Sequence, residues 1–429
     1  MEVCKELEAL SKEFNKRGYK LYIVGGYTRD NLLQIKNDDI DICSNMPVDK
    51  VIDVCKELKY STKNINKSLG TILIKIKNIQ LEYTQFRIES YKSHGEHTPN
   101  KIEFTDDLTL DCLRRDLTIN SIYYDIKERQ FIDPVNGMSD LKKQIIKTSQ
   151  APSITLSDDG LRILRTIRFA STYNFRIEKK TLKALKIYSP LLNKISKERI
   201  LKELGQIVVA DYKFNKQNQN FMKLCNNLNL RKYIFNSTLS KSPKFTKKEI
   251  VSFYNLGKDA RLIGFYILVL KKYFIGYQDG KQLSFTVNNL LGINGIRESN
   301  NNAMLTEKLY RVYQNLEYEI DTLNASINYL TFSNSEREII ENFLSKNAKE
   351  ILSLTIQIIK KHNLPTSVHQ LDVSAQDLID EGIDRVYISK ILSTLFNQVL
   401  QMSVKNKKED LIRLAKDIHN TFKEIKEQL

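Results

Sequence analysis

The sequence predicts an α+β fold, in which a mixed α/β head built around a β-sheet is followed by an all-α remainder. From residue 20 to about residue 148, short β-branched and aromatic runs alternate with helical patterns. Beyond residue 156 the strand signals fade, and apolar residues recur at helical spacing. The 429 residues also exceed what one core needs, so two to four packed units are expected.

The composition points to a globular chain with a polyanionic partner. Hydrophobic residues make up 41% and charged residues 28%, and no apolar tract is long enough to span a membrane. The amino terminus lacks the pattern of a signal peptide, which predicts a cytoplasmic location. A net charge of +16 suits nucleic-acid binding, although a lysine-rich composition alone would also produce it. Neither the five cysteines nor the five histidines show metal-ligand spacing.

Four segments of the head are expected to be strands because they are rich in β-branched and aromatic residues. They cover residues 21–24, 71–76, 80–86 and 121–124. In the helical part, residues 236–248 are polar and contain Pro243, and a second break lies at residues 363–367. Both segments are expected to be loops between groups of helices.

The first candidate site is a glycine turn. Residues 21–33 predict a strand, then Gly25 and Gly26, then a helix. Paired glycines allow the backbone to approach a phosphate, and a helix amino terminus offers N–H groups to it. Arg29 lies about one turn into the helix and could reach the same anion. Taken alone, this pattern is more often a plain tight turn.

Two aspartates strengthen the case. On a strand, Asp39 and Asp41 would project from one face while Ile40 and Ile42 point into the core. Two carboxylates on one face suit Mg²⁺, and such a site serves nucleotidyl transfer, in which a 3′-hydroxyl attacks the α-phosphate of a nucleoside triphosphate. An isolated pair is more often an acidic edge strand or a capping cluster, but the upstream glycine turn reverses that preference. Glu82 could complete the site or form a structural salt bridge.

Four ordered motifs in the first 170 residues resemble the signature of class II CCA-adding enzymes and bacterial poly(A) polymerases. They are Gly25-Gly-Tyr-Thr-Arg-Asp30, Asp39-Ile-Asp41, Leu113-Arg-Arg-Asp-Leu-Thr-Ile-Asn120 and Asp159-Gly-Leu-Arg-Ile-Leu-Arg-Thr-Ile-Arg-Phe169. The resemblance implies a nucleotidyltransferase head over residues 1–148 and a base-recognising helical neck over 149–210. It also implies a tRNA-binding helical body over 211–364 and a tRNA-binding tail over 365–429. The implied substrates are CTP, ATP and the acceptor stem and elbow of tRNA, with Mg²⁺ as cofactor and no protein partner.

The third motif places Arg115 beside Asp116, and Thr118 and Asn120 are small polar residues suited to hydrogen-bonding a turn. The resemblance implies that Arg115 contacts the incoming nucleotide. For Arg114, a surface salt bridge is the expected role.

The fourth motif bears on nucleotide choice. On a helix, Asp159, Arg162, Arg165 and Arg168 would line one face, beside an apolar strip of Leu161, Leu164 and Ile167. A solvated basic stripe would explain the arginines poorly, because lysine is the commoner cation elsewhere in the chain and only arginine offers a planar fork. The resemblance implies that Asp159 and Arg162 read the base, and that Arg165 and Arg168 face the triphosphate or support the reading pair.

Two regions depart from the family pattern. The tail motif over residues 371–392 is similar to that of many CCA-adding enzymes, which favours CCA addition, but Asp384 and Arg385 replace the usual Gly-Pro. The loop over residues 88–103 carries Ser93-His-Gly-Glu-His-Thr-Pro99 where relatives often have Asp and Arg before the proline. CC-only, A-only and poly(A) addition therefore stay open. Outside this class, a non-catalytic RNA-binding protein and a small-molecule nucleotidyltransferase are the alternatives.

Overall fold

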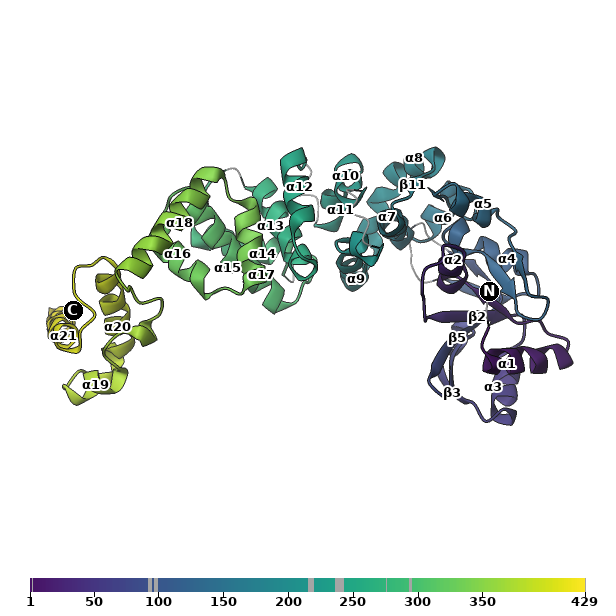
Figure 1. The fold of residues 1–429 in the computed structure, drawn as a ribbon, viewed down its shortest axis with the longest axis horizontal. Coiled ribbons are helices and arrows are strands. Elements are labelled where there is room, and N and C mark those ends of the chain that lie inside the picture. The colour runs from purple at the N-terminus through teal and green to yellow at the C-terminus, as the bar shows by residue number, and fades with distance from the viewer. Residues whose placement is uncertain are drawn as a thin grey trace. The chain divides into compact units, whose positions relative to one another are not determined.

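The computed structural model describes residues 1, 3–91, 95, 99–214, 220–235, 243–274, 276–292 and 295–428. The chain divides into two compact units (Figure 1). The first comprises Met1–Ile250 and Asn288–Ser299, and the second comprises Val251–Val287 and Asn300–Leu429. The expected division into head, neck, body and tail stays a prediction.

The first unit is organised around a seven-stranded sheet with the strand order β3-β4-β5-β2-β1-β8-β9. The strands β2 and β5 run parallel, and the other neighbours in this sheet are antiparallel. The seven are β1 (Tyr22–Val24), β2 (Ile40–Ser44), β3 (Ser61–Asn66), β4 (Thr71–Ile76), β5 (Ile79–Gln85), β8 (Tyr123–Asp125) and β9 (Gln130–Ile132). Two small pairs, β6 (Arg87–Ser90) with β7 (Lys101–Phe104) and β10 (Ile145–Ile146) with β11 (Arg176–Ile177), stand apart from it. All four predicted strands are present within about two residues of their expected bounds.

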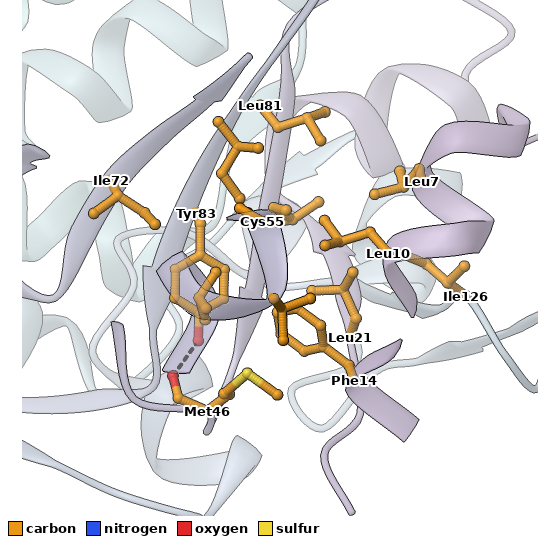
Figure 2. Packing of buried hydrophobic residues seen from close by; sticks show 14 of the residues in the cluster. Leu7, Leu10, Phe14, Leu21, Met46, Cys55, Ile72, Leu81, Tyr83 and Ile126 are labelled. Atoms are coloured by element: carbon orange, nitrogen blue, oxygen red, sulfur yellow. Dashed lines mark hydrogen bonds between the residues drawn. The ribbon is translucent and has the colours of Figure 1, made fainter. Parts of the chain in front are cut away.

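One face of the sheet carries the main core of the first unit. Helices α1 (Lys5–Lys16) and α3 (Val48–Glu57) pack there with side chains such as Leu10, Phe14 and Val51. Figure 2 shows Phe14 and Tyr83 among these packed side chains, with the Tyr83 hydroxyl donating to the carbonyl of Met46. Ile42 lies in this core and Ile40 packs against its edge, as the strand alternation predicted.

The opposite face of β2 leads to the candidate site. Cys43, two residues beyond Asp41, packs in a smaller cluster with Val24, Tyr123 and Cys112 of α4 (Leu108–Leu113). Because alternate residues of a strand share a face, Asp41 is on the side away from α1 and α3. The fold thus separates the acidic face of β2 from the apolar one.

After the head sheet the first unit is almost entirely helical, as predicted. Residues 236–242 of the expected interhelical loop lie outside the described residues. The remaining helices up to this point are α2 (Gly26–Leu32), α5 (Gly137–Lys142), α6 (Pro152–Asp158), α7 (Leu161–Tyr173), α8 (Lys179–Tyr188), α9 (Lys197–Ile207), α10 (Asn220–Asn227) and α11 (Leu230–Ile234). In α7, Leu161, Leu164 and Ile167 are buried, which confirms the predicted apolar strip.

From α12 onward the described elements are helices. They are α12 (Lys247–Asn255), α13 (Arg261–Tyr273), α14 (Gly280–Leu290), α15 (Asn300–Glu317), α16 (Thr322–Thr331), α17 (Asn334–Phe343), α18 (Lys346–Lys361), α19 (Ala375–Asp380), α20 (Arg385–Leu400) and α21 (Lys408–Gln428). The predicted break at residues 363–367 falls after α18. None of the helices in the described part of the chain is long and apolar enough to cross a membrane.

The end of the second unit shows what the Asp384-Arg385 sequence does. Asp384 precedes the first residue of α20 in an extended conformation, and its carboxylate lies 3.1 Å from the buried His419 ring of α21. The Asp384 backbone N–H also donates to that ring at 3.3 Å. A side-chain contact from α21 therefore fixes the start of α20, where relatives use Gly-Pro.

Candidate active site

A cavity of about 580 Å³ in the first unit brings the predicted site residues together. This volume is typical of small-ligand sites. The cavity lining includes all nine of them: Gly26, Arg29, Asp39, Asp41, Arg115, Asp159, Arg162, Arg165 and Arg168. In all, eight cationic side chains and five carboxylates line it, which favours an anionic ligand.

The glycine turn adopts a conformation that glycine permits. Gly25 has φ +81°, and a Cβ there would stand 3.2 Å from Asp41 Oδ2. Gly26 begins α2, and the Thr28 hydroxyl donates to the carbonyls of Gly25 and Ile122, both at 3.0 Å. The turn is thereby tied to the chain just before β8 and held against the acidic face of β2.

Arg29 is held in place by several partners. Its Nε donates to Asp30 at 2.8 Å, and Nη1 donates to Asn120 Oδ1. Its guanidinium also lies 4.8 Å from the ring centroid of Tyr173, whose hydroxyl donates to Asp30. Asp30 is fully buried and so connects the glycine turn to α7.

The paired aspartates lie at the entrance to β2. Asp41 is within the strand, whereas Asp39 directly precedes it and its N–H donates to Asn37 Oδ1 at 3.0 Å. The expectation that both lie on the strand is therefore correct only for Asp41. Burial, together with the nearby Glu82 and Asp39 carboxylates, raises the pKa of Asp41 to about 6. A cluster of like charges of this kind is stabilised by a bound cation.

Glu82 is the register partner of Asp41 on the neighbouring strand β5. Its side chain reaches the surface, and partial desolvation by the surrounding protein, followed by repulsion from Asp39, raises its pKa. Across the described ranges of the chain, no three His, Cys, Asp or Glu side chains are grouped to hold a metal ion. Asp39 and Asp41 nevertheless offer hard oxygen ligands, which suit a divalent cation that keeps other ligands.

Arg114 and Arg115 share the fully buried Asp111. Arg115 Nη2 donates to Asp111 Oδ2 at 3.1 Å and Nε to the Tyr123 hydroxyl at 3.0 Å, while Arg114 Nε donates to Asp111 Oδ1 at 2.8 Å. Burial would raise the pKa of Asp111, but the two arginines and Tyr123 outweigh it and bring that pKa to about 2. The expected salt bridge of Arg114 exists, but the prediction that it lies on the surface is wrong, because the side chain is mostly buried in the cavity wall.

Asp159 and Arg162 lie next to each other in the wall of the cavity. Asp159 is not on a helix, which corrects the prediction: it stands in extended backbone between α6 and α7, and its carboxylate accepts from the Leu161 N–H at 2.8 Å. Arg162 Nη2 donates to the carbonyl of Arg114 at 2.8 Å, and Nη1 to that of Thr155 at 3.2 Å. Burial raises the pKa of Asp159 to about 6, and Arg162 opposes that shift.

Arg165 and Arg168 are supported from two sides. Arg165 Nε donates to Asp116 Oδ2 and Arg168 Nε to Glu203 Oε2 of α9, both at 2.8 Å. Their guanidinium carbons lie 5.6 Å and 4.6 Å from the ring centroid of Phe169, and that of Arg29 lies 5.1 Å from it. Three guanidinium groups from α2 and α7 therefore gather around one aromatic ring.

The third motif serves as the support for this wall. Asn120 Nδ2 donates to Asp116 Oδ1 at 3.0 Å, and the Thr118 hydroxyl donates to Asp140 at 2.9 Å. Both contacts agree with the predicted hydrogen bonding of this turn. Burial would raise the pKa of Asp116, but Arg165 and Asn120 outweigh it and bring that pKa to about 2.

Sequence reasoning missed several residues of the site. Asp111 and Glu203 each bond to a predicted site residue, the ring of Tyr173 packs against the Arg29 guanidinium, and Glu89 and Lys213 line the cavity. Asp111 lies four residues before Arg115, a helical spacing that could have suggested the pair. The others come from distant segments and carry no local signal. Residues 92–94 and 96–98 of the loop thought to bear on nucleotide choice lie outside the described residues.

Two family matches cover parts of the first unit. Residues 21–147 match the family described as poly A polymerase head domain. Residues 174–214 match the family described as probable RNA and SrmB-binding site of polymerase A. The head match includes the glycine turn, both aspartates and Arg115.

Named relatives are similar to about half of the chain. The chain is 35% identical over 206 residues to the CCA-adding enzyme of Enterococcus faecalis, covering 48% of this chain and 49% of that protein. It is 36% identical over 210 residues to that of Ligilactobacillus salivarius, covering 49% and 50%. The match thus spans about half the length of these curated relatives.

Solved structures share the fold over nearly the whole chain. The CCA-adding enzyme of Bacillus stearothermophilus in complex with CTP superposes with a TM-score of 0.65 at 18% identity, covering 98% of this chain and 100% of that one. The Thermotoga maritima enzyme complexed with tRNA gives a TM-score of 0.64 at 19% identity, covering 97% and 96%. Residues 21–147, which carry the glycine turn, the paired aspartates and Arg115 of the candidate site, are thus similar to the poly A polymerase head domain.

Proposed function

We propose that this protein adds CCA, or part of it, to the 3′ end of tRNA from CTP and ATP, without a nucleic-acid template. The observation that carries the proposal is a single cavity that holds the glycine turn and paired aspartates together with Asp159 and Arg162. Transfer chemistry and base selection thus have residues of suitable type within one nucleotide-sized space.

Asp39 and Asp41 would hold Mg²⁺. The fit rests on the position of Asp41 beside the Asp39 and Glu82 carboxylates, which together with burial raise its pKa and whose charge a divalent cation would neutralise. When bound, magnesium supplies activation of the attacking 3′-hydroxyl and neutralisation of charge on the leaving pyrophosphate. The two carboxylates fix where that chemistry occurs, because β2 and the turn at Gly25 hold Asp41 beside the phosphate-binding turn.

The arginines of the cavity would bind and orient the triphosphate. Arg29, Arg165 and Arg168 surround Phe169, and each keeps a carboxylate partner that fixes its orientation. A guanidinium that is already oriented loses little side-chain entropy on binding phosphate. Arg115, held by Asp111 and Tyr123, would add a further contact to the nucleotide.

Asp159 and Arg162 would select the base. Cytosine and adenine both present an exocyclic amine beside an unprotonated ring nitrogen, so a carboxylate can accept from the amine and a guanidinium can donate to the ring nitrogen. Guanine and uracil present the opposite polarity at these positions. Arg162 is anchored by two backbone carbonyls, which keeps its donors aimed in a fixed direction.

The tRNA would be held by the helical regions, in the predicted division into neck (149–210), body (211–364) and tail (365–429). Support comes from the net charge of +16, from the RNA-binding family match at residues 174–214, and from the relatives named as CCA-adding enzymes. A cytoplasmic location, where tRNA is processed, and the lack of a protein partner stay predictions.

The test is to sequence the products made on tRNA that ends at the discriminator base and on tRNA that ends in CC. The purified chain is given CTP alone, ATP alone, both, or each of the other triphosphates. CC from CTP alone and CCA from the mixture are expected. Products of the mixture that end in CC would assign CC-only addition. A single A added to tRNA-CC would assign A-only addition, and a long A tract would assign poly(A) addition. No extension of any RNA would leave a non-catalytic RNA-binding protein or a small-molecule enzyme.

A further inference from the structure

Lys213 lies at the glycine-turn end of the cavity but comes from a different part of the chain. It belongs to the short 3₁₀ segment η4 (Ala210–Phe214), which packs against α7. Its Nζ is 3.8 Å from Asp30 Oδ2, the oxygen that accepts from Asn37 Nδ2 at 2.8 Å. The same Asn37 nitrogen is 3.3 Å from where a Cβ on Gly26 would stand. One short chain of contacts therefore links Lys213 to the turn.

Lys213 differs from the other cations of the cavity in its exposure. Its side chain is 52% exposed, whereas the seven arginines that line the cavity are 5% to 34% exposed. Lysine carries a compact charge on a long flexible stem, so an exposed one can follow a ligand that the fixed arginines cannot approach. A half-exposed ammonium thus complements the more buried guanidinium groups of the cavity wall.

The position of Lys213 indicates which phosphates it would meet. Asp39 and Asp41 must face the α-phosphate, because the bond that breaks lies there. Lys213 stands instead on the α2 side of the turn, beside Asp30, which also pairs with Arg29. That side is left for the β- and γ-phosphates, which depart together as pyrophosphate.

We infer that Lys213 binds the β- or γ-phosphate of the incoming nucleoside triphosphate. The inference rests on the proposed function, since it requires a triphosphate in this cavity. It extends the nucleotide site beyond α7, into the segment matched to RNA binding. Triphosphate binding would thereby add a contact to η4, next to the region expected to meet tRNA.

The test compares CTP and CMP binding to the full-length protein in the absence of tRNA. By calorimetry, Lys213→Gln should weaken CTP binding about tenfold, at the low end for hydrogen bonds to charged groups because the side chain is half exposed. CMP, which lacks the outer phosphates, should bind within about twofold of wild type. Lys213→Arg should restore most of the CTP affinity, because it restores the charge.

The control is Lys202→Gln, since Lys202 is an exposed lysine of α9 in the same RNA-binding match but outside the cavity. Its CTP affinity should equal that of wild type. Unchanged CTP binding by Lys213→Gln, or equal weakening of CTP and CMP, would overturn the inference. Weakened tRNA binding with unchanged CTP binding would instead assign Lys213 to the RNA. Failure of the wild-type protein to bind CTP at all would defeat the proposed function as well.

Discussion

Arg162 and Asp159 lie side by side with Arg162 Nε 4.0 Å from Asp159 Oδ2, while both terminal nitrogens of Arg162 donate to backbone carbonyls. This distance is longer than a hydrogen bond, so the Arg162 guanidinium and the Asp159 carboxylate lie side by side without a hydrogen bond between these two atoms. A base edge that offers an amine and a ring nitrogen can therefore engage both.

Removing either member of this pair should change nucleotide choice. Arg162→Ala should weaken use of both CTP and ATP, and Asp159→Ala should relax rejection of UTP, each by about 1–3 kcal/mol for a lost bidentate contact. The measurement is incorporation of each triphosphate alone on tRNA that ends at the discriminator base. Asp158→Ala is the matched control, because Asp158 ends α6 outside the cavity. If Asp159→Ala rejects UTP and GTP as wild type does, selection resides elsewhere.

Substitution of Glu203 should change the KM values for all nucleotides to the same extent. Glu203→Gln removes the charge that orients Arg168, and Arg168→Ala removes the guanidinium itself. Both variants should raise the KM for CTP and the KM for ATP by the same factor, about tenfold for a lost charged hydrogen bond, because the proposal places these groups at the phosphates rather than at the base. Glu198→Gln, on the exposed side of α9, should leave KM unchanged. A change in the CTP to ATP preference of Glu203→Gln would contradict this assignment.

Asp111 should make the head more stable at neutral pH than in acid. Its folded pKa of about 2 lies below the ordinary value of 3.8, so the ionised form is favoured by folding. The resulting stability, on the order of 2 kcal/mol, is complete above the unfolded pKa and is lost as pH falls toward 2. Asp111→Asn should therefore lower the denaturation midpoint more at pH 7 than at pH 3. Asp53→Asn, a control at an exposed position, should leave the denaturation midpoint unchanged at both pH values. An equal fall in the denaturation midpoint of Asp111→Asn at both pH values would rule out an ionic origin of the stability that Asp111 provides.

Alanine variants of Gly25 and Gly18 distinguish the effect of backbone strain from the effect of a changed site geometry. Both have positive φ, +81° and +79°, but a Cβ at Gly25 meets Asp41 Oδ2 at 3.2 Å while one at Gly18 meets nothing within 4 Å. Alanine at either position should cost about 1 kcal/mol of stability. Only Gly25→Ala should also lower kcat, because it displaces the Asp41 carboxylate that the proposal assigns to the metal site. Equal kcat values for the two variants would show that the Gly25 contact does not matter for transfer.

The sequence was informative where local pattern determines structure. Runs of β-branched and aromatic residues identified β1, β4, β5 and β8. Strand alternation identified the opposed faces of Asp41 and Ile42, and helical spacing identified the apolar strip of α7. It failed where a tertiary contact overrides the pattern. The three-residue spacing of the fourth motif suggested a helix from Asp159, but that carboxylate bonds the Leu161 N–H and holds its own residue in extended backbone.

The supporting residues could not be predicted, because their role depends on distant packing. Glu203 reaches Arg168 from 35 positions away along the chain, and Tyr173 reaches Asp30 from 143. No spacing rule connects such pairs, and neither residue is unusual in its own helix. Asp384 shows the converse. The sequence departs there from the expected Gly-Pro, yet the buried His419 ring contacts Asp384 and holds the start of α20 in place.

The most direct test of the account is transfer by Asp39→Asn and Asp41→Asn, with the neighbouring, exposed Asp38→Asn as control. The amide keeps the shape and removes the charge that would hold the cation. Single-turnover addition of CMP to tRNA should fall by about a thousandfold or more in each site variant, with tRNA affinity within a few-fold of wild type and Asp38→Asn fully active. Transfer near the wild-type rate by either Asp39→Asn or Asp41→Asn would contradict the assignment of the paired carboxylates to the catalytic metal site.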